Sequence, residues 1–182
     1  MRNLLSILFA LFLNSAIFGQ LSGIYTIPSS EIPSVRYAME QLNLLGAGNG
    51  GVTFNITAGY VEVTSDSLYL EASGKSGELI TFQKSGSGAN PLIRRTGAGN
   101  RVTAAMGGNG DAVVILQGCD HVVFDSLDIA TEDQGVEYGY LFRKSGQNNG
   151  CKYVTIKNGT ITMTKGTSTY VAGVYASNHD AN

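Results

Sequence analysis

Short runs of alternating hydrophobic and polar residues occupy most of the chain after residue 51. In the run VTFNI, Val52, Phe54 and Ile56 alternate with polar positions, which is the two-residue period of a strand with one buried face. Similar runs follow at residues 79–83, 112–116, 121–129, 153–163 and 170–176. Glycine, serine, asparagine or aspartate bounds each run, so the pattern predicts many short strands joined by turns.

One earlier stretch has a helical period instead. Val35, Met39, Leu42 and Leu45 recur at three- and four-residue spacing, which predicts a helix over about residues 33–45. Because one face of this helix is apolar, we expect that face to pack against another part of the protein.

Two stretches thirty-two residues apart match each other without a gap. They are GCDHVVFDSLDI at 118–129 and GCKYVTIKNGTI at 150–161. Stacked as successive coils of a solenoid, they place Phe124 beside Ile156 in the interior and keep the inward and outward alternation of both copies. The alternative, an antiparallel sandwich, predicts no fixed long period. The repeat therefore favours a solenoid.

The composition agrees with an ordered, strand-rich domain. The 182 residues include 24 glycines, three prolines and no tryptophan, and 43% are hydrophobic against 14% charged. The first nineteen residues differ, because Arg2 precedes an apolar segment from Leu4 to Phe18. This pattern predicts a secretory signal peptide, and the segment is too short for a membrane span.

The charge balance argues against nucleic acid as a partner. Cleavage after residue 19 would remove Arg2 and leave 11 basic residues against 14 acidic ones, a net charge of −3. Binding to phosphates needs a basic face, and the nearest approach to one is Arg94, Arg95 and Arg101. These arginines could instead hold an acidic polysaccharide. We expect a secreted or cell-surface protein without a membrane span after signal cleavage.

Three stretches carry a family resemblance. They are GIYTIPSSEIPSVRYAMEQLNLLGAGNGGVTFNI, ITFQKSGSGANPLI and VILQGCDHVVFDSLDI. Together they resemble the N-terminal part of large secreted right-handed parallel β-helix proteins of the pectin-lyase-like type from Bacteroidetes-type bacteria, and the resemblance covers nearly all of residues 22–182. Such proteins commonly end in a type IX secretion sorting domain, which is not recognisable in this sequence.

The repeat and the resemblance together predict the fold class. We expect an all-β fold, a right-handed parallel β-helix or solenoid, with the N-terminal α-helix capping its open end. The expected parts are a signal peptide at 1–19, a cap at 20–51 that includes the helix, and coils at 52–182. A third copy of the Gly-Cys pair would fall at the last residue, so we expect an incomplete fragment.

The visible coils offer no converging catalytic groups. Asp125 and Asp128 are the closest to a carboxylate pair, but they lie on either side of the expected corner, and the next copy has Lys157 in place of a carboxylate. His121 and His179 lack partners at metal-ligand spacing. We expect no catalytic, cofactor or metal site in these coils.

Glycan binding is the candidate chemistry that the residues leave open. The tyrosines of the last third could form a stripe on which sugars stack. The candidate contacts are Tyr138, Tyr140 and Tyr153, with Arg94 and Arg95 for an acidic polymer. The expected partner is an extracellular polysaccharide or a cell-surface glycan.

The two cysteines occupy equivalent positions of the repeat. On neighbouring strands of stacked coils, Cys119 and Cys151 would lie close enough for a disulfide, and export would permit oxidation. In-register side chains on parallel strands also point the same way, which allows stacked free thiols. Both states stay open on the sequence alone.

Two functions follow from these patterns. The first is a secreted or surface-displayed protein with a structural, adhesive or glycan-binding role. The alternative is the N-terminal part of a polysaccharide lyase or glycoside hydrolase whose active coils lie beyond residue 182, and only this alternative would call for Ca²⁺.

Overall fold

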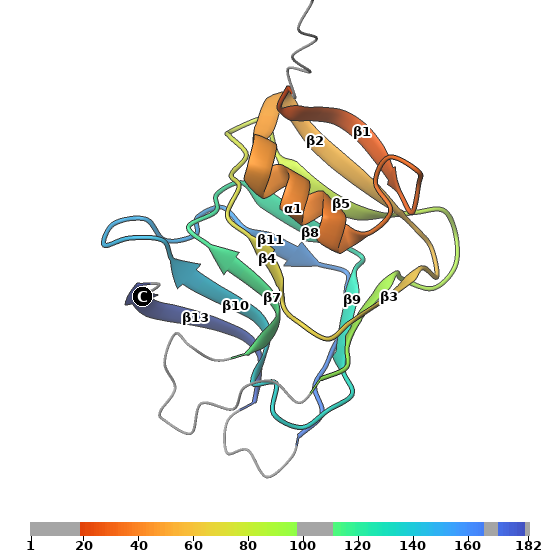
Figure 1. The fold of residues 1–182 in the computed structure, drawn as a ribbon, viewed down its shortest axis with the longest axis vertical. Coiled ribbons are helices and arrows are strands. Elements are labelled where there is room, and N and C mark those ends of the chain that lie inside the picture. Colours follow the sequence, from red (N-terminus) through yellow and green to blue (C-terminus); the bar gives the residue numbers. More distant parts are fainter. Residues whose placement is uncertain (1–18, 98–110, 166–170, 181–182) are drawn as a thin grey trace, which may run out of the picture.

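Three parallel sheets and one helix make up the computed structural model, which describes residues 19–97, 111–165 and 171–180 (Figure 1). The predicted signal peptide at 1–19 lies outside these residues except for its last position, and Arg101, Tyr170 and the C-terminal two residues also lie outside them.

The chain contributes one strand to each sheet in turn. The first sheet contains, in spatial order, β1 (Leu21–Ile27), β2 (Ala47–Thr57), β5 (Ile80–Ser85), β8 (Val122–Asp125) and β11 (Thr155–Lys157). The second contains β3 (Val61–Thr64), β6 (Leu92–Arg95), β9 (Asp128–Thr131) and β12 (Ile161–Thr162). The third contains β4 (Leu68–Leu70), β7 (Ala112–Gln117), β10 (Tyr138–Lys144) and β13 (Ala172–Asp180).

All pairings between neighbouring strands of these sheets are parallel. We call each set of three consecutive strands a level. Level 1 is β2–β4, level 2 is β5–β7, level 3 is β8–β10 and level 4 is β11–β13. Each level lies beside the next in all three sheets.

The spacing between levels is not constant. Phe54 pairs with Phe82, Phe82 with Phe124, and Phe124 with Ile156, so the intervals are 28, 42 and 32 residues. The 42-residue interval arises because the connection between β6 and β7 covers residues 96–111, whereas that between β3 and β4 covers only 65–67. The thirty-two-residue register of the sequence repeat therefore holds only between levels 3 and 4, in the first and second sheets. In the third sheet Tyr138 pairs with Ala172, an interval of 34 residues.

This arrangement corrects the predicted fold class. We expected an all-β, right-handed parallel β-helix, a regular solenoid of equal coils. The structure consists mostly of strands in three parallel sheets, together with one short helix, and its levels are unequally spaced. The prediction was wrong because two copies of a motif give a single interval, and a single interval cannot establish a period.

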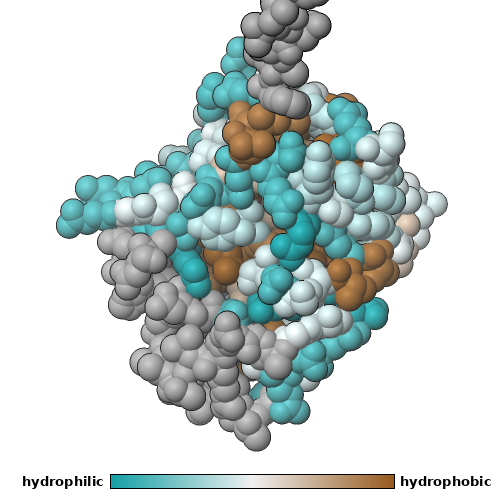
Figure 2. Space-filling view, viewed as in Figure 1, coloured by the Kyte–Doolittle hydropathy of each residue, from teal (hydrophilic) through white to brown (hydrophobic). Residues whose placement is uncertain are grey.

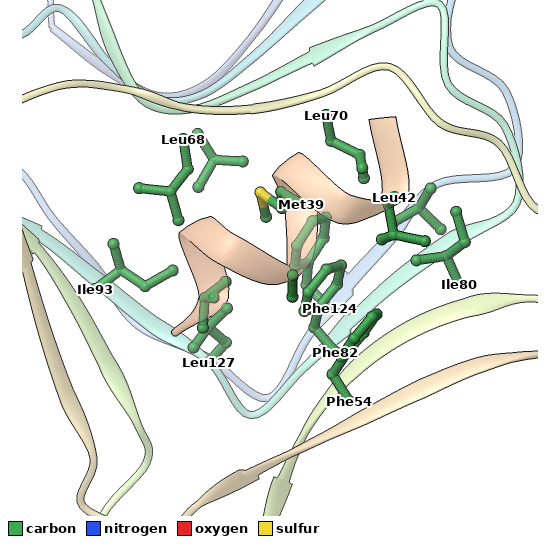
Figure 3. Close-up of a cluster of buried hydrophobic side chains, with 14 of the residues drawn as sticks. Met39, Leu42, Phe54, Leu68, Leu70, Ile80, Phe82, Ile93, Phe124 and Leu127 are labelled. Carbon is green, nitrogen blue, oxygen red and sulfur yellow. The ribbon is translucent and has the colours of Figure 1, made fainter. Parts of the chain in front are cut away.

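A column of aromatic rings runs through the interior. Tyr25, Phe54, Phe82 and Phe124 stack in sequence, with ring centroids 5.6, 4.9 and 5.3 Å apart. The three phenylalanines are fully or almost fully buried, and Figure 3 shows their rings one behind another. Burial of each ring removes a large apolar surface from water, and the stacking adds to this gain. The column therefore joins levels 1, 2 and 3.

Helix α1 (Val35–Leu45) lies over the level 1 end of the interior, in front of the sheets in Figure 1. Its buried face consists of Val35, Ala38, Met39 and Leu42, and Figure 3 shows Met39 and Leu42 within the cluster of buried hydrophobic side chains. The three- and four-residue spacing of these positions is the pattern that predicted the helix.

One hydroxyl group and one carboxylate accept hydrogen bonds from backbone N–H groups in the first turn of this helix. Ser34 accepts a hydrogen bond from the backbone N–H of Tyr37 at 3.0 Å, which is an ordinary N-cap. Glu62, which lies on β3 and is buried, accepts from the backbone N–H groups of Val35 and Arg36 at 2.7 and 3.0 Å. The negative carboxylate also interacts favourably with the positive N-terminal end of the helix dipole. Glu62 thus fastens the helix to the second sheet.

The opposite end of the interior is less well covered. Val154, Ile156 and Ile161 of level 4 are only partly buried, and Val174 is 50% exposed. Strands β11, β12 and β13 stand at the edges of their sheets among the described strands. Level 4 therefore has a smaller share of the core than levels 1 to 3.

The corner between the first and second sheets uses left-handed backbone. Ser126 and Asn158 have φ values of 58° and 57° at equivalent positions of levels 3 and 4. Gly159 follows, and a Cβ atom there would overlap the carbonyl oxygen of Leu127. Asparagine adopts left-handed angles with less strain than most residues, because its short polar side chain can form local hydrogen bonds.

Truncating Phe82, whose ring lies between those of Phe54 and Phe124, should destabilise the fold. We expect Phe82→Ala to lower the free energy of unfolding by about 3–5 kcal/mol, because it leaves a cavity between two stacked neighbours. Phe82→Leu should cost less, since it fills more of the space. Urea unfolding monitored by circular dichroism measures both, with Leu44→Ala at a 74% exposed helix position as the control. Equal effects of Phe82→Ala and Leu44→Ala would contradict the column.

Candidate functional site

The predicted tyrosine contacts are not brought together. Tyr138 is 2% exposed and stacks on Tyr175 at 4.6 Å between ring centroids. Tyr140 is fully buried beside Phe124, and burial raises its pKa, so its phenol stays neutral. Neither ring has a face open to a sugar. Tyr153 alone of the three is exposed, at 72%.

The two predicted arginine contacts are not brought together either, because one is buried and the other lies at the surface. Arg95 is 3% exposed; it forms an ion pair with Asp111 at 3.3 Å and donates to the hydroxyl of Ser67 at 2.9 Å. Arg94, its neighbour on β6, points to the surface and pairs with Glu132 at 3.1 Å. Adjacent residues of a strand face opposite sides, so the two guanidinium groups cannot act on one ligand.

Tyr153 forms an exposed aromatic pair with His121. The two ring centroids are 4.5 Å apart and the ring planes differ by 15°. The two residues stand thirty-two positions apart; His121 directly precedes β8, and Tyr153 lies two residues before β11. We call this pair the aromatic corner. Sequence reasoning missed His121, although the repeat register already aligned it with Tyr153.

The backbone at the aromatic corner is strained. His121 and Tyr153 both have φ of 56°, in the left-handed region that glycine or asparagine adopts more readily. Histidine, like asparagine, is enriched at such angles, so the cost of about 1–3 kcal/mol falls mainly on Tyr153. The corner thus keeps a bulky tyrosine ring at a position where glycine or asparagine would fold with less strain.

Polar groups surround the aromatic corner. Lys152 donates its backbone N–H to the Asp120 carboxylate at 2.7 Å, and the backbone N–H of Asp120 donates to the hydroxyl oxygen of Ser73 at 2.9 Å. The Gly74 N–H donates to the Asp120 carbonyl at 2.9 Å, which brings the following turn with its Lys75–Glu78 ion pair to this side. The residues that directly precede His121 and Tyr153 are therefore Asp120, with a carboxylate, and Lys152, with an ammonium group.

Asp125 and Asp128, the carboxylates considered for catalysis, are engaged in a structural network. Asp128 accepts from Asn90 at 2.9 Å and from the backbone N–H of Thr160 at 2.8 Å. Asp125 accepts from Asn158 at 2.8 Å and pairs with Lys157 at 3.1 Å. These bonds link level 3 to level 4, and through Asn90 to level 2, at the corner between the first and second sheets.

The network favours the charged form of Asp125. The hydrogen bond from Asn158, followed by the contacts with Lys157 and Ser126, holds the pKa of Asp125 below its ordinary value of 3.8, against partial burial, which acts to raise it. A carboxylate that is stabilised in this way is a poor general acid near neutral pH.

The two cysteines are neighbours across levels 3 and 4. Their Sγ atoms are 3.8 Å apart and both residues are free thiols. Cys119 is fully buried and Cys151 is partly exposed. The sulfurs therefore meet in the register that aligns the Gly-Cys pairs of the repeat.

The described residues contain neither a cluster of metal ligands nor a membrane-spanning helix. Within residues 19–97, 111–165 and 171–180, no three His, Cys, Asp or Glu side chains gather as metal ligands. Over those residues no helix has the length and apolar character to cross a membrane. On the face shown in Figure 2, hydrophobic side chains form separate patches between polar ones.

Comparison of the chain with protein-family models, with curated proteins and with solved structures finds no match.

The Asp125 network predicts a pH dependence. Because the folded-state pKa of Asp125 lies below its ordinary value of 3.8, Asp125 stabilises the fold above that value, and this contribution is lost as the pH falls through the folded-state pKa. We expect Asp125→Asn to lower the free energy of unfolding at pH 7 by at most about 1 kcal/mol, because the pair is partly solvated.

The difference between the wild type and Asp125→Asn should disappear as urea unfolding is repeated at progressively lower pH. Lys157→Met is the matched control, since it removes the partner and should show the same convergence. A difference that persists at the acid end of the titration would contradict the assignment.

Proposed function

We propose that this protein binds glycans at the aromatic corner, as a secreted or cell-surface protein with a structural or adhesive role. The observation that carries the proposal is the stacked pair of His121 and Tyr153, with Tyr153 72% exposed. The apolar face of a sugar ring packs well on an exposed aromatic ring, because both surfaces are flat and shed weakly bound water.

The strain at Tyr153 supports a role for its ring outside folding. The left-handed backbone angles of Tyr153 cost free energy that glycine or asparagine would largely avoid. Tyr153 is too exposed to recover this cost by burial in the core. A bound ligand that packs on the ring would give the side chain a function that the fold does not require.

The neighbouring polar groups suit hydroxyl-bearing ligands. Sugars present donors and acceptors around the edge of their rings, and sites that orient them combine a flat apolar face with a few polar side chains. Asp120 is partly exposed and the Lys152 side chain is exposed, next to the two aromatic residues in sequence. Carboxylate and ammonium groups can serve as acceptor and donor there.

This proposal narrows the set of glycan contacts expected from the sequence. Tyr138, Tyr140 and Arg95 are buried, so they serve the interior. Arg94 is partly exposed but lies on β6 of the second sheet and pairs with Glu132. Tyr153 is kept as a contact, and His121 is added to it.

Export is part of the same proposal. Arg2 followed by the apolar segment Leu4 to Phe18 supports a signal peptide, and the resemblance to secreted bacterial surface proteins supports display outside the cell. An extracellular polysaccharide is then the partner that such a protein would meet.

Replacing Tyr153 should separate binding from folding. Asparagine tolerates the left-handed angles of this position, so we expect Tyr153→Asn to be at least as stable as the wild type in urea. Loss of the stacking face should weaken polysaccharide binding by about tenfold, equivalent to about 1.4 kcal/mol. Affinity gel electrophoresis with polygalacturonate, xylan, glucan or mannan in the gel measures the effect.

Tyr37→Ala is the control, because Tyr37 is a 37% exposed tyrosine on α1, away from the aromatic corner. Its variant should migrate like the wild type in each gel. The proposal fails if no polymer retards the wild type, or if Tyr153→Asn is retarded as strongly as the wild type.

A further inference from the structure

The Gly-Cys repeat places two thiols in contact without bonding them. Asp120 and Lys152, the residues that follow the cysteines, form a parallel bridge, so the two chains run side by side at this point. The Sγ atoms of Cys119 and Cys151 are 3.8 Å apart. Gly118 is confined here as well, because an added Cβ atom would overlap Ser145.

The backbone spacing permits a bond between the sulfurs. Neighbouring strands lie about 4.8 Å apart, inside the range of about 4.4–6.8 Å between Cα atoms that a disulfide requires. A bond would bring the sulfurs from contact to about 2.05 Å, a movement that side-chain rotation can supply. No change of strand register is needed.

The two sulfurs differ in their access to reagents. Cys119 is fully buried, whereas Cys151 is partly exposed. When protonated, the Cys151 thiol is within donor distance of the Leu116 carbonyl at 3.3 Å. A hydrogen bond from the Cys119 thiol lowers the pKa of Cys151 to about 7, while that same pairing, together with burial, raises the pKa of Cys119. The thiolate is the nucleophile in disulfide exchange, so Cys151 is the first to react.

We propose that Cys119 and Cys151 are an oxidation site, at which exchange with a small-molecule disulfide closes an intrachain bond between levels 3 and 4. The Cys151 thiolate attacks one sulfur of the reagent, forming a mixed disulfide and releasing one reagent thiolate. The Cys119 thiol then loses its proton to that thiolate and attacks the Cys151 sulfur, which releases the second reagent thiolate. Two protein thiols are oxidised and one reagent disulfide is reduced to two thiols.

The bond would act where the core is weakest. Level 4 is only partly buried, and its strands β11 and β12 contain three and two residues. A bond between Cys119 and Cys151, thirty-two positions apart, would close a loop that contains strands β8, β9 and β10, and would tie the chain just before β11 to the start of level 3. Closing a loop of this length limits how far the segment can open. This inference is independent of the proposed glycan binding.

The test uses the full chain, reduced and then incubated with glutathione disulfide. Intact mass and alkylation after denaturation should show the loss of two thiols per chain, a product lighter by two hydrogen atoms, and a monomer. Brief alkylation of the native reduced protein, followed by peptide mapping, should label Cys151 at least tenfold faster than Cys119. This second measurement needs no variant and therefore does not depend on a mutant folding.

Single variants give the matched pair. Cys119→Ser should accumulate a glutathione adduct on Cys151, and Cys151→Ser should leave Cys119 unmodified over the same time. Tryptic cleavage after Lys157 should be slower in the oxidised wild type than in the reduced protein. Two thiols that remain alkylatable, a bond between two chains, equal labelling of both cysteines, or cleavage that oxidation leaves unchanged would overturn the proposal.

Discussion

Side-by-side pairing of parallel strands, with like residues in register, is the constraint on which the rest of this structure depends. In the interior the register stacks Tyr25, Phe54, Phe82 and Phe124 at centroid separations between 4.9 and 5.6 Å. A slip by one residue would turn these rings to the outside and bring polar neighbours inward. The rings thus select the register, and the backbone hydrogen bonds hold it.

The same register determines what meets outside the core. Equivalent residues at the first-sheet strands of levels 3 and 4 are thirty-two positions apart in the sequence. This interval places His121 beside Tyr153, Cys119 beside Cys151, and Asp125 beside Lys157. None of these contacts needs a special loop, because each follows from two chains running in parallel. The candidate binding surface and the thiol pair are therefore consequences of strand pairing, and their chemistry depends on which residues occupy the equivalent positions.

Much of the local structure could be predicted from the sequence. The helix was expected at about 33–45 and runs from Val35 to Leu45, because its apolar spacing is long and regular. The pairing of Phe124 with Ile156 also followed from the repeat. The unequal spacing of the levels could not be predicted. The connection at residues 96–111 lengthens one interval to 42 residues, and no sequence signal marks it as an insertion.

The functional residues were harder to predict than the strands. Tyr138 and Tyr140 look like a surface stripe in the sequence, but residues Tyr138–Leu141 of β10 are all buried, so alternation does not separate an inner from an outer face. A strand that is buried on both faces lacks the alternation of hydrophobic and polar residues found in a strand with one face exposed to solvent. His121 was overlooked because it was judged as a metal ligand and not as an aromatic ring, although the register had already aligned it with Tyr153.

Nuclear Overhauser spectroscopy on the isotope-labelled chain tests the central claim, that level 3 and level 4 pair in register, most directly. Rings with centroids 4.5 Å apart should give strong cross-peaks between the His121 and Tyr153 ring protons. Cross-peaks between Phe124 and Ile156 should accompany them, because these residues are strand partners. The account predicts both sets together. Cross-peaks from Tyr153 to a different strand, with none to His121, would contradict it.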